Sequence, residues 1–463
     1  MRKNIIARHM TYVTVGMIIN ILVIMAYYIN HPGVEVLSDS WSYLYVVDRI
    51  QTTGQFVNFW RLPCYPLFIT LVYALAGQGN IEVVSIAQGI LFVCTTLEIY
   101  ILAALIFKRP WIALLISLMV GCNFTLLSYI KPLMSEGMGL WLVTSLTLST
   151  VIFLKTFRWR FLWLITLCLL LLFMTRPEWL YFPPLLFTYL LLIAFWRKAF
   201  LRLLPHVIVA TLLLYIVAGA YVYVNATQNN FAGMTWVQNI NEFGKILQYN
   251  MQDSSTSPQA VAIKSMVARY KAHGINDPYI MMGRNPQLFR DNLKSIGSYS
   301  LSIILHHPIT YVRKTIPLLF SSLSVFAQES HVSSTGLFAA PLYLWQSASR
   351  VFHSSDIFAP LAAIFWLCAL CIKQVRRQLS AQALGFIILL CTYGIIITAV
   401  GGYRDIDYMR IHVLFEPLII ILLWGTILVG MRFIYLQQFR SRGKNIVPGY
   451  AKELNYALST TAK

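Results

Sequence analysis

Long apolar runs recur along the chain, and their spacing predicts a bundle of membrane-spanning helices. A helix needs about 20 apolar residues to cross the hydrocarbon core of a bilayer. The runs that reach or approach this length are 11–29, 82–107, 111–130, 136–154, 161–175, 179–196, 205–224, 357–373, 381–400 and 412–431. Two further stretches, 309–327 and 336–352, fit either a pair of spans or helices lying at the interface. The pattern predicts an all-α polytopic integral membrane protein with about 10–12 transmembrane helices and extracytoplasmic interfacial helices.

The composition agrees with this fold class and narrows the range of partners. Only 11% of the 463 residues are charged and 58% are hydrophobic, whereas a soluble domain carries about 25% charged residues. The formal net charge is +19. In so apolar a chain, anionic lipid headgroups explain this charge better than a nucleic acid does. We therefore expect membrane lipids, and no nucleic acid, among the partners.

The basic residues predict how the chain is oriented. Loops on the cytoplasmic side of a membrane protein are enriched in Lys and Arg. The basic clusters are Arg2, Lys3 and Arg8; Lys108 and Arg109; Lys155, Arg158 and Arg160; Arg197, Lys198 and Arg202; Lys373, Arg376 and Arg377; and Arg432, Arg440, Arg442 and Lys444. Counting spans from a cytoplasmic N-terminus places every cluster inside. No small-residue cleavage site follows the run 11–29, so we expect a retained first span and both termini in the cytoplasm.

Two long polar segments fall on the opposite side of the membrane. The first is 31–80, and the second is 225–308, which is rich in Asn, Gln, Ser and Lys. We expect the second to form an extracytoplasmic loop, a cap of short helices or a small subdomain. The predicted organisation is 1–224, an N-terminal transmembrane module with the outer loop 31–80; 225–308, the outer subdomain; 309–436, C-terminal transmembrane helices; and 437–463, a basic cytoplasmic tail.

Few residues inside the spans indicate chemistry. Cys368 and Cys371 form a CxxC pair in Ala- and Leu-rich sequence without a second pair. Buried cysteines of this kind usually pack as small hydrophobic residues. Glu98 lies within a span, where a carboxylate is either functional or hydrogen-bonded for structural reasons. We expect no cofactor and no metal site.

The first outer loop carries the sharpest candidate for catalysis. It contains Asp39 just before a predicted helix over 41–50, with Trp41 and Tyr43 as interfacial anchors, and then Arg61 and Tyr65 in a Pro-rich segment. Asp is a favoured N-cap residue, so a capping role is the structural alternative for Asp39. The functional interpretation is a general base, because a carboxylate at the membrane face can take a proton from an acceptor.

Three more loops bring charged residues to the same predicted face. They contribute Lys131 and Glu136; Arg176 and Glu178; and Arg404, Tyr408 and Arg410. Singly, each has an ordinary explanation: a loop ion pair, a helix cap, or a lysine reaching a headgroup. Together they indicate a site, because Arg binds phosphate through two donors and Lys binds it as a point charge.

At these residues the sequence resembles the GT-C class of membrane glycosyltransferases, especially bacterial enzymes related to protein mannosyltransferases and the aminoarabinose transferase. Those enzymes carry an Asp in the first outer loop and a Tyr four residues later, here Asp39 and Tyr43. A basic-Pro-x-Tyr-Pro segment follows, here 61–66, and an Arg-containing segment leads into Glu-Pro late in the chain, here 410–417. The resemblance is dense over about the first 200 residues. Ser40 stands where many relatives have a second acidic residue, which argues against a bound divalent cation.

The resemblance implies an inverting transferase with a GT-C-like bundle in the bacterial inner membrane. Its donor would be a sugar linked to a polyprenyl phosphate, and its acceptor an extracytoplasmic glycan, lipid or protein. Asp39 would be the catalytic base. Arg61, Lys131, Arg176 and Arg410 would bind the donor phosphate, and Tyr43, Tyr65, Glu136, Glu178, Arg404 and Tyr408 would contact the substrates.

Three further functions are compatible with the sequence. A lipid-linked glycan transporter or flippase would also be polytopic and basic, although two related halves and charges near the midplane are its usual signs. A polymerase or ligase that acts on lipid-linked glycans fits the same pattern of spans and charges. So does a non-catalytic scaffold for envelope assembly.

Overall fold

The computed structural model covers the whole chain and describes residues 2–252, 258–277, 280–281, 284–285, 293–322, 339–402 and 405–442. These residues form helices and connecting segments, and none of them lies in a β-strand. In chain order the elements are α1 (Arg2–Asn30), α2 (Ser38–Thr53), α3 (Cys64–Ala76), α4 (Ile81–Phe107), α5 (Pro110–Gly121), α6 (Phe124–Ile130), α7 (Glu136–Thr156), α8 (Trp159–Phe173), η1 (Pro177–Tyr181), α9 (Phe182–Trp196), α10 (Phe200–Asn229), α11 (Trp236–Gln248), α12 (Pro258–Ala272), α15 (Leu293–His306), α16 (Pro308–Ser321), α17 (Ala339–Ser354), η3 (Ser355–Phe358), α18 (Ala359–Cys371), α19 (Lys373–Arg376), α20 (Leu379–Gly401), α21 (Asp405–His412) and α22 (Glu416–Arg442). The predicted all-α polytopic fold class is confirmed.

Seven helical segments among the described residues are long and apolar enough to cross a membrane. They are His9–Asn30, Ile81–Phe107, Glu136–Thr156, Pro177–Trp196, Phe200–Asn229, Tyr343–Cys371 and Leu379–Gly401. The bent pair of α5 and α6 would make an eighth. The predicted spans 161–175 and 412–431 correspond to two shorter apolar helices, Trp159–Phe173 and Glu416–Met431.

The two stretches that the sequence assigned either to spans or to interfacial helices differ in the structure. The stretch 309–327 begins with α16, which has only 14 residues and contains Pro317. The described part of the stretch 336–352 lies in α17, which continues through η3 into α18, so that it joins 357–373 in the single candidate span Tyr343–Cys371. Pro360 does not separate them, because a proline in the first turn of a helix gives up no intrahelical hydrogen bond.

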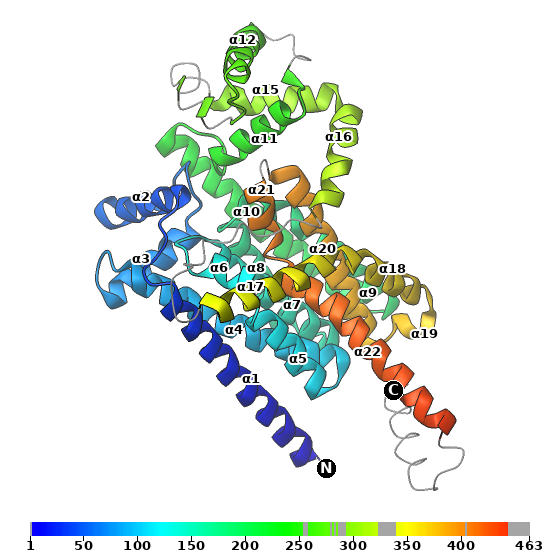
Figure 1. Cartoon of the computed structure of the whole chain (residues 1–463). Helices are drawn as coiled ribbons and strands as arrows, with labels where there is room; N and C mark the ends of the chain where they lie inside the picture. Colours follow the sequence, from blue (N-terminus) through cyan, green and yellow to red (C-terminus); the bar gives the residue numbers. More distant parts are fainter. Residues whose placement is uncertain are drawn as a thin grey trace.

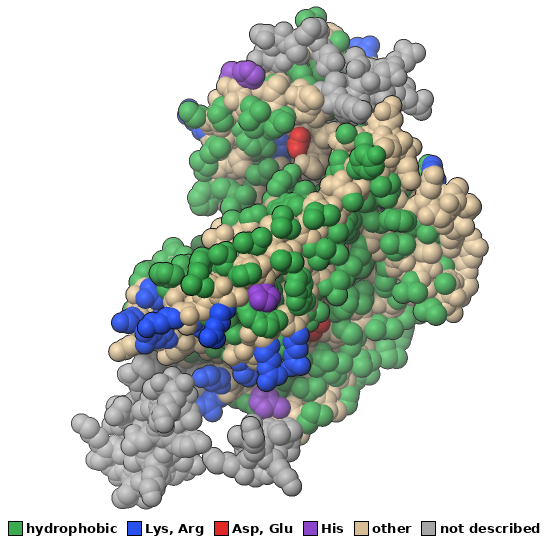
Figure 2. All heavy atoms as spheres, turned by 180° about the vertical axis from the view of Figure 1, so that it is seen from behind, with side chains coloured by type: hydrophobic (Ala, Val, Ile, Leu, Met, Phe, Trp, Pro, Cys, Tyr) green, Lys and Arg blue, Asp and Glu red, His purple; other side chains and the backbone are tan. Residues whose placement is uncertain are grey.

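The bundle has two distinct ends (Figure 1). The cap end carries α2, α11, α12, α15 and α16, whereas the terminus end holds the start of α1 and the end of α22. Seen from behind, Lys and Arg side chains gather toward the terminus end, below an apolar surface (Figure 2). This distribution of charge is the one that the positive-inside rule associates with a cytoplasmic face.

Two hydrophobic cores hold the molecule together. The larger core contains buried residues from α4, α5, α7, α8, α9, α20 and α22. The smaller core lies within the cap end and includes Phe243, Ile263, Tyr299 and Tyr311. The cap end therefore has apolar packing of its own, from α11, α12, α15 and α16, next to the transmembrane bundle.

Breaks in the transmembrane helices place charged loops at the cap end. Asn123 caps α6 by accepting a hydrogen bond from the Leu126 amide (3.3 Å), and α5 and α6 meet at a bend of 54°. Pro177 opens the short 3-10 helix η1, whose N-cap is Arg176 in an extended conformation. Such interruptions are tolerated in a membrane protein where they are buried in the protein or line a cavity.

Candidate active site

Helix α2 presents Asp39 in its first turn. The N-cap residue is Leu37, and its amide donates to Ser40 Oγ (2.9 Å), while Ser40 Oγ donates to the Leu133 carbonyl (2.8 Å). The capping alternative for Asp39 is therefore wrong: Ser40 takes that role, and the Asp39 carboxylate is directed elsewhere. A carboxylate in the first turn also interacts favourably with the helix dipole.

The two aromatic residues of this turn point in different directions. Trp41 is 67% exposed, as an interfacial anchor would be, but Tyr43 is only 3% exposed. The Tyr43 hydroxyl donates to Ser135 Oγ (3.0 Å), and its ring meets the Tyr65 ring edge-on at 4.8 Å. The interfacial role expected of Tyr43 is therefore wrong, because residues two apart on a helix lie on nearly opposite faces.

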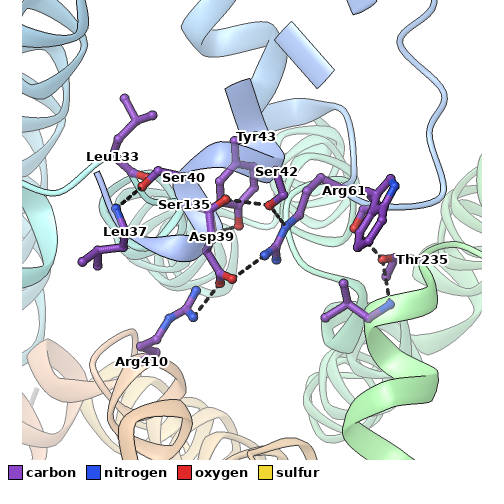
Figure 3. A network of polar contacts seen from close by, with 12 residues as sticks. Leu37, Asp39, Ser40, Ser42, Tyr43, Arg61, Leu133, Ser135, Thr235 and Arg410 are labelled. Atoms are coloured by element: carbon purple, nitrogen blue, oxygen red, sulfur yellow. Dashed lines mark hydrogen bonds and ion pairs between the residues drawn. The ribbon is translucent and has the colours of Figure 1, made fainter. Parts of the chain in front are cut away.

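Two arginines from distant segments hold the Asp39 carboxylate (Figure 3). Arg61 Nη2 lies 2.7 Å from Oδ1, and Arg410 Nη1 lies 2.7 Å from Oδ2. Arg61 comes from the segment between α2 and α3, and Arg410 from α21, which is 371 residues away from Asp39 along the chain. The side chain of Asp39 is 28% exposed, more than either arginine, so a second molecule can reach it.

The ion pairs extend into an alternating chain of six charged side chains. Arg410 Nε lies 2.6 Å from Glu136 Oε1, and Arg176 Nη1 lies 3.4 Å from the same oxygen. Arg176 Nε then donates to Glu178 Oε1 (2.6 Å). The order is Arg61, Asp39, Arg410, Glu136, Arg176 and Glu178. Three cations balance three carboxylates, which is what permits so much charge to be buried in an apolar protein.

The charge state of Asp39 follows from its two partners. Burial opposes ionisation, but the guanidinium groups of Arg410 and Arg61 outweigh it and lower the pKa of Asp39 to about 2. The carboxylate is therefore ionised at neutral pH. It is also a weak proton acceptor for as long as both arginines remain in contact with it, because basicity falls as the pKa falls.

Two buried atoms of this chain of charges have no hydrogen-bond partner among the described residues. They are Glu136 Oε2 and Arg176 Nη1. Glu136 is only 1% exposed. A buried polar group without a partner is costly, by about 1–3 kcal/mol or more if charged. A hydroxyl or phosphate group of a bound molecule could satisfy both atoms.

The segment that carries Arg61 is fixed by elements of the cap end. The Tyr221 hydroxyl donates to the Asn58 carbonyl (2.8 Å), and Thr235 Oγ1 donates to the Trp60 carbonyl (2.9 Å). The rings of Trp60 and Trp236 pack edge to face at 4.3 Å. Arg61 itself donates through Nε to Ser42 Oγ (2.7 Å) and covers the Tyr43 ring at 4.6 Å.

Helix α21 is attached to the cap end through a residue that the sequence did not single out. Lys245 of α11 is fully buried, and its Nζ donates to the Tyr408 hydroxyl (2.9 Å). Gln248 Nε2 donates to the same hydroxyl (3.0 Å). The signal available in the sequence was a lysine on the apolar face of an amphipathic helix. The cap end thus contacts both segments that hold Asp39, through Thr235 and through Lys245.

Of the remaining predicted residues, Tyr65 lies beside this centre and Lys131 does not join it. The Tyr65 hydroxyl donates to Gln88 Oε1, and Gln88 Nε2 donates to the Pro132 carbonyl (2.8 Å). Lys131 is placed apart from the alternating chain, with its Nζ over the Tyr28 ring at 5.5 Å. Burial lowers the pKa of Lys131, and Glu35 acts in the opposite direction. Arg404 lies outside the described residues.

Comparison with known proteins returned structures rather than a family. No family model and no curated protein matches the chain. It is similar to the archaeal oligosaccharyltransferase AglB from Archaeoglobus fulgidus in complex with an inhibitory peptide and a dolichol-phosphate, with a TM-score of 0.49 and 11% identity. It is also similar to the apo oligosaccharyltransferase of that organism, with a TM-score of 0.48 and 11% identity. Each alignment covers 98% of this chain and 54% of the other, so the chain spans about half the length of those proteins.

A second group of ionisable residues lies beside α21. Asp356, His412 and Glu416 are buried, and their ligand-type atoms all lie within 4.8 Å of one another. His412 Nε2 is 3.6 Å from Asp356 Oδ2 and 3.4 Å from Glu416 Oε2. One imidazole and two carboxylates are a donor set that suits a divalent metal. The sequence missed this group because its members come from η3, α21 and α22.

Proposed function

We propose that this protein is an inverting glycosyltransferase of the GT-C kind, which moves a sugar from a polyprenyl-phosphate donor to an extracytoplasmic acceptor. The observation that carries the proposal is the accessible Asp39 carboxylate between the guanidinium groups of Arg61 and Arg410. A carboxylate that could act as the base and two cations that could bind phosphate thus lie within a few ångströms of each other, which supports the proposal. The site lies at the cap end, opposite the gathered Lys and Arg, which supports an extracytoplasmic position.

The reaction is a single displacement in which atoms and charge balance. The acceptor hydroxyl attacks the anomeric carbon, and Asp39 takes its proton. The bond from that carbon to the phosphate oxygen breaks, and the electron pair leaves with the lipid phosphate. The phosphodiester carries one negative charge and the departing phosphomonoester gains a second. Cations at the phosphate therefore stabilise the transition state more than the ground state.

The arginines have two functions in this proposal. In the free protein they hold Asp39 and keep its pKa at about 2. When the sugar donor binds, its phosphate competes with Asp39 for the N–H groups of Arg61 and Arg410, because both anions accept bidentate hydrogen bonds from guanidinium. Each N–H group that turns from Asp39 to the phosphate stabilises the Asp39 carboxylate less and so raises the pKa of Asp39. Donor binding thus makes Asp39 a stronger base when the acceptor needs one.

The neighbouring groups orient the sugar and complete the phosphate site. Glu136 Oε2 accepts a hydrogen bond from a sugar hydroxyl, and Arg176 Nη1 donates one to the phosphate or the sugar. These are the two buried atoms that have no hydrogen-bond partner among the described residues. Tyr43 and Tyr65 form the wall beneath Arg61. Glu178 and Tyr408 fix Arg176 and α21. Lys131 acts on the donor only if substrate binding brings it to this centre, and Arg404 remains a candidate for substrate contact.

The acceptor approaches from the cap end. Helices α11, α12, α15 and α16 lie beyond α2 and α21 at the cap end in Figure 1, and α11 contacts both arginine-bearing segments. The cap end therefore selects the acceptor, whether glycan, lipid or protein. A chimera that carries the segment 225–308 of a relative should change the acceptor and keep the donor; unchanged acceptor choice would contradict this role.

The decisive experiment measures sugar transfer by the purified protein. Full-length protein in nanodiscs would be given a panel of radiolabelled polyprenyl-phosphate sugars together with a membrane extract as the source of acceptor. We expect the wild type to release label from one donor. Asp39→Asn should lose about 10²–10⁴-fold in rate, which is the usual contribution of a general base.

Asp48→Asn is the matched control. Asp48 lies on the same helix and is exposed, so its variant should transfer sugar at the wild-type rate. Normal transfer by Asp39→Asn would remove Asp39 from the chemistry. A folded wild type that binds no donor on the panel, but moves a lipid-linked glycan across the bilayer, would favour the transporter instead.

A further inference from the structure

A large cavity lies at the terminus end, on the opposite side of the bundle from Asp39. Its volume is about 1160 Å³, and it is lined by Phe195, Trp196, Arg197, Lys198, Phe200, Leu201, Arg202, Lys373, Arg376, Arg377 and Gln382. It is formed where α9 ends, α10 begins, and α19 leads into α20. Helix α20 then runs 23 residues toward the site, which corresponds to about 35 Å.

The lining combines cations with apolar side chains. Six of its members are Lys or Arg, and none is acidic. The aromatic and aliphatic members provide an apolar wall, and Arg376 lies over the Trp196 ring at 4.6 Å. Figure 2 shows the Lys and Arg side chains grouped on this end of the molecule. A cavity that is both cationic and apolar fits an anion attached to a hydrocarbon chain.

Part of the cationic lining is held in place by the fold. Arg197 Nη1 donates to the Leu154 carbonyl (2.7 Å), and Arg197 Nη2 donates to Gln382 Oε1. Gln382 Nε2 in turn donates to the Arg376 carbonyl (3.0 Å). These contacts join the loop between α9 and α10 to the loop between α18 and α20. Two loops about 170 residues apart in sequence therefore present their charges to one cavity.

The chain offers little charge of its own to neutralise this cavity. Cytoplasmic loops of membrane proteins are basic in general, but that rule does not require cations from two loops to line one cavity. The segment 437–463 contains Arg440, Arg442, Lys444, Lys452 and Lys463 and a single acidic residue, Glu453. Its own net charge is positive, so it does not supply the compensating anion. The compensating anion has to come from outside the protein.

We propose that this cavity binds the anionic headgroup of a phospholipid from the membrane leaflet at the terminus end. The phosphate contacts the Lys and Arg side chains, and the acyl chains lie along Phe195, Phe200 and Leu201. The site is separate from Asp39 and does not depend on the proposed transferase activity. A net negative headgroup is preferred, because a zwitterionic lipid brings its own cation into a cavity that already carries six.

Lipid binding to the full chain can be measured by native mass spectrometry in detergent, with phosphatidylglycerol, phosphatidylcholine and inorganic phosphate as separate probes. We expect phosphatidylglycerol to bind at least about tenfold more tightly than phosphatidylcholine. The variant Arg202→Gln/Lys373→Gln/Arg377→Gln should bind phosphatidylglycerol about 100-fold more weakly, from the usual contribution of each cation. These three side chains make no hydrogen bond or ion pair with other described residues, so the variant should keep its fold.

The matched control removes the same charge from the same end of the molecule. Lys155→Gln/Arg158→Gln/Arg160→Gln changes exposed cations beside the junction of α7 and α8, and it should bind phosphatidylglycerol like the wild type. Equal losses in the two triple variants would overturn the proposal, as would equal affinity for the two lipids. Inorganic phosphate that binds as tightly as phosphatidylglycerol would assign the cavity to a soluble anion. If the cavity variant does not fold, the comparison of the lipids on the wild type still decides the question.

Discussion

Arg410 joins α21 to both α2 and α7, so its loss should affect stability as well as activity. In Arg410→Gln the contacts of 2.7 Å to Asp39 and 2.6 Å to Glu136 disappear. Glu136 is 1% exposed and would keep only Arg176, at 3.4 Å, of the cations that contact it in the structure. Arg61→Gln is the matched comparison, because it also removes one guanidinium from Asp39 but leaves Glu136 paired.

The difference in stability between these variants can be estimated. Removing one partner of a buried ion pair costs about 3–5 kcal/mol, because the other charge remains buried. Removing a partner from a partly exposed pair such as Arg61 with Asp39 costs about 0–1 kcal/mol. Arg410→Gln should therefore lower the free energy of unfolding by about 3 kcal/mol more than Arg61→Gln. Both variants should lose about 10²–10³-fold in sugar transfer, as for other lost preorganised contacts.

A double variant separates stability from catalysis. Arg410→Gln/Glu136→Gln removes both charges of the buried pair, and such paired removal is often nearly neutral. Unfolding titrations in mixed detergent micelles should show most of the stability restored, while sugar transfer stays low. Equal destabilisation by Arg410→Gln and Arg61→Gln, or no recovery in the double variant, would refute the assignment of the energy to Glu136.

Four further predictions rest on the same contacts. Donor binding draws the arginines away from Asp39, so the pKa of Asp39 should be higher in the enzyme–substrate complex than in the free enzyme, where it is about 2. The acid limb of the kcat profile should therefore lie at higher pH than the acid limb of kcat/KM. Coincident acid limbs would contradict this change of arginine partners. Because the pKa of Asp39 is lowered in the folded protein, the ionised carboxylate stabilises the fold above about pH 4, and this stabilisation is lost as the pH falls toward 2. Acid unfolding should therefore show a difference in unfolding free energy between the wild type and Asp39→Asn that shrinks over this range. Chelation should leave sugar transfer unchanged, since both Asp39 oxygens contact arginines. A lower unfolding midpoint with unchanged transfer would indicate a metal bound away from Asp39, for which Asp356, His412 and Glu416 are the candidate ligands. Tyr408→Phe removes the hydroxyl that accepts from Lys245 and should lower the unfolding free energy by about 1–3 kcal/mol, with a smaller loss of activity than Arg410→Gln.

The sequence predicted the helical fold class and most of the residues that meet around Asp39. Apolar runs identify spans because a bilayer demands long uninterrupted hydrophobic segments. Charged residues are rare in this chain, so each one beside a span was conspicuous, and Asp39, Arg61, Glu136 and Arg410 were found in this way. Their biological roles remain predictions.

Contacts that depend on packing could not be predicted. The pairing of Asp39 with Arg410 spans 371 residues, and no local pattern specifies it. Lys245 lies on the apolar face of an amphipathic helix, but no local pattern indicates that its partner is Tyr408, 163 residues away along the chain. The helical phase of α2 does constrain its aromatic residues, because Trp41 and Tyr43 are two positions apart and cannot both face the membrane.

The distance in sequence between Arg410 and its partners also has a consequence for synthesis. When the chain has been made only as far as α20, Asp39, Glu136 and Glu178 have been inserted with just Arg61 and Arg176 to balance them. Glu136 then sits in an apolar bundle with its closest cation still to be translated. Burying such a carboxylate without a partner is expensive. The last cation of the site is therefore translated after every carboxylate that it balances, and a chain that ends before residue 405 would have to bury Glu136 without it.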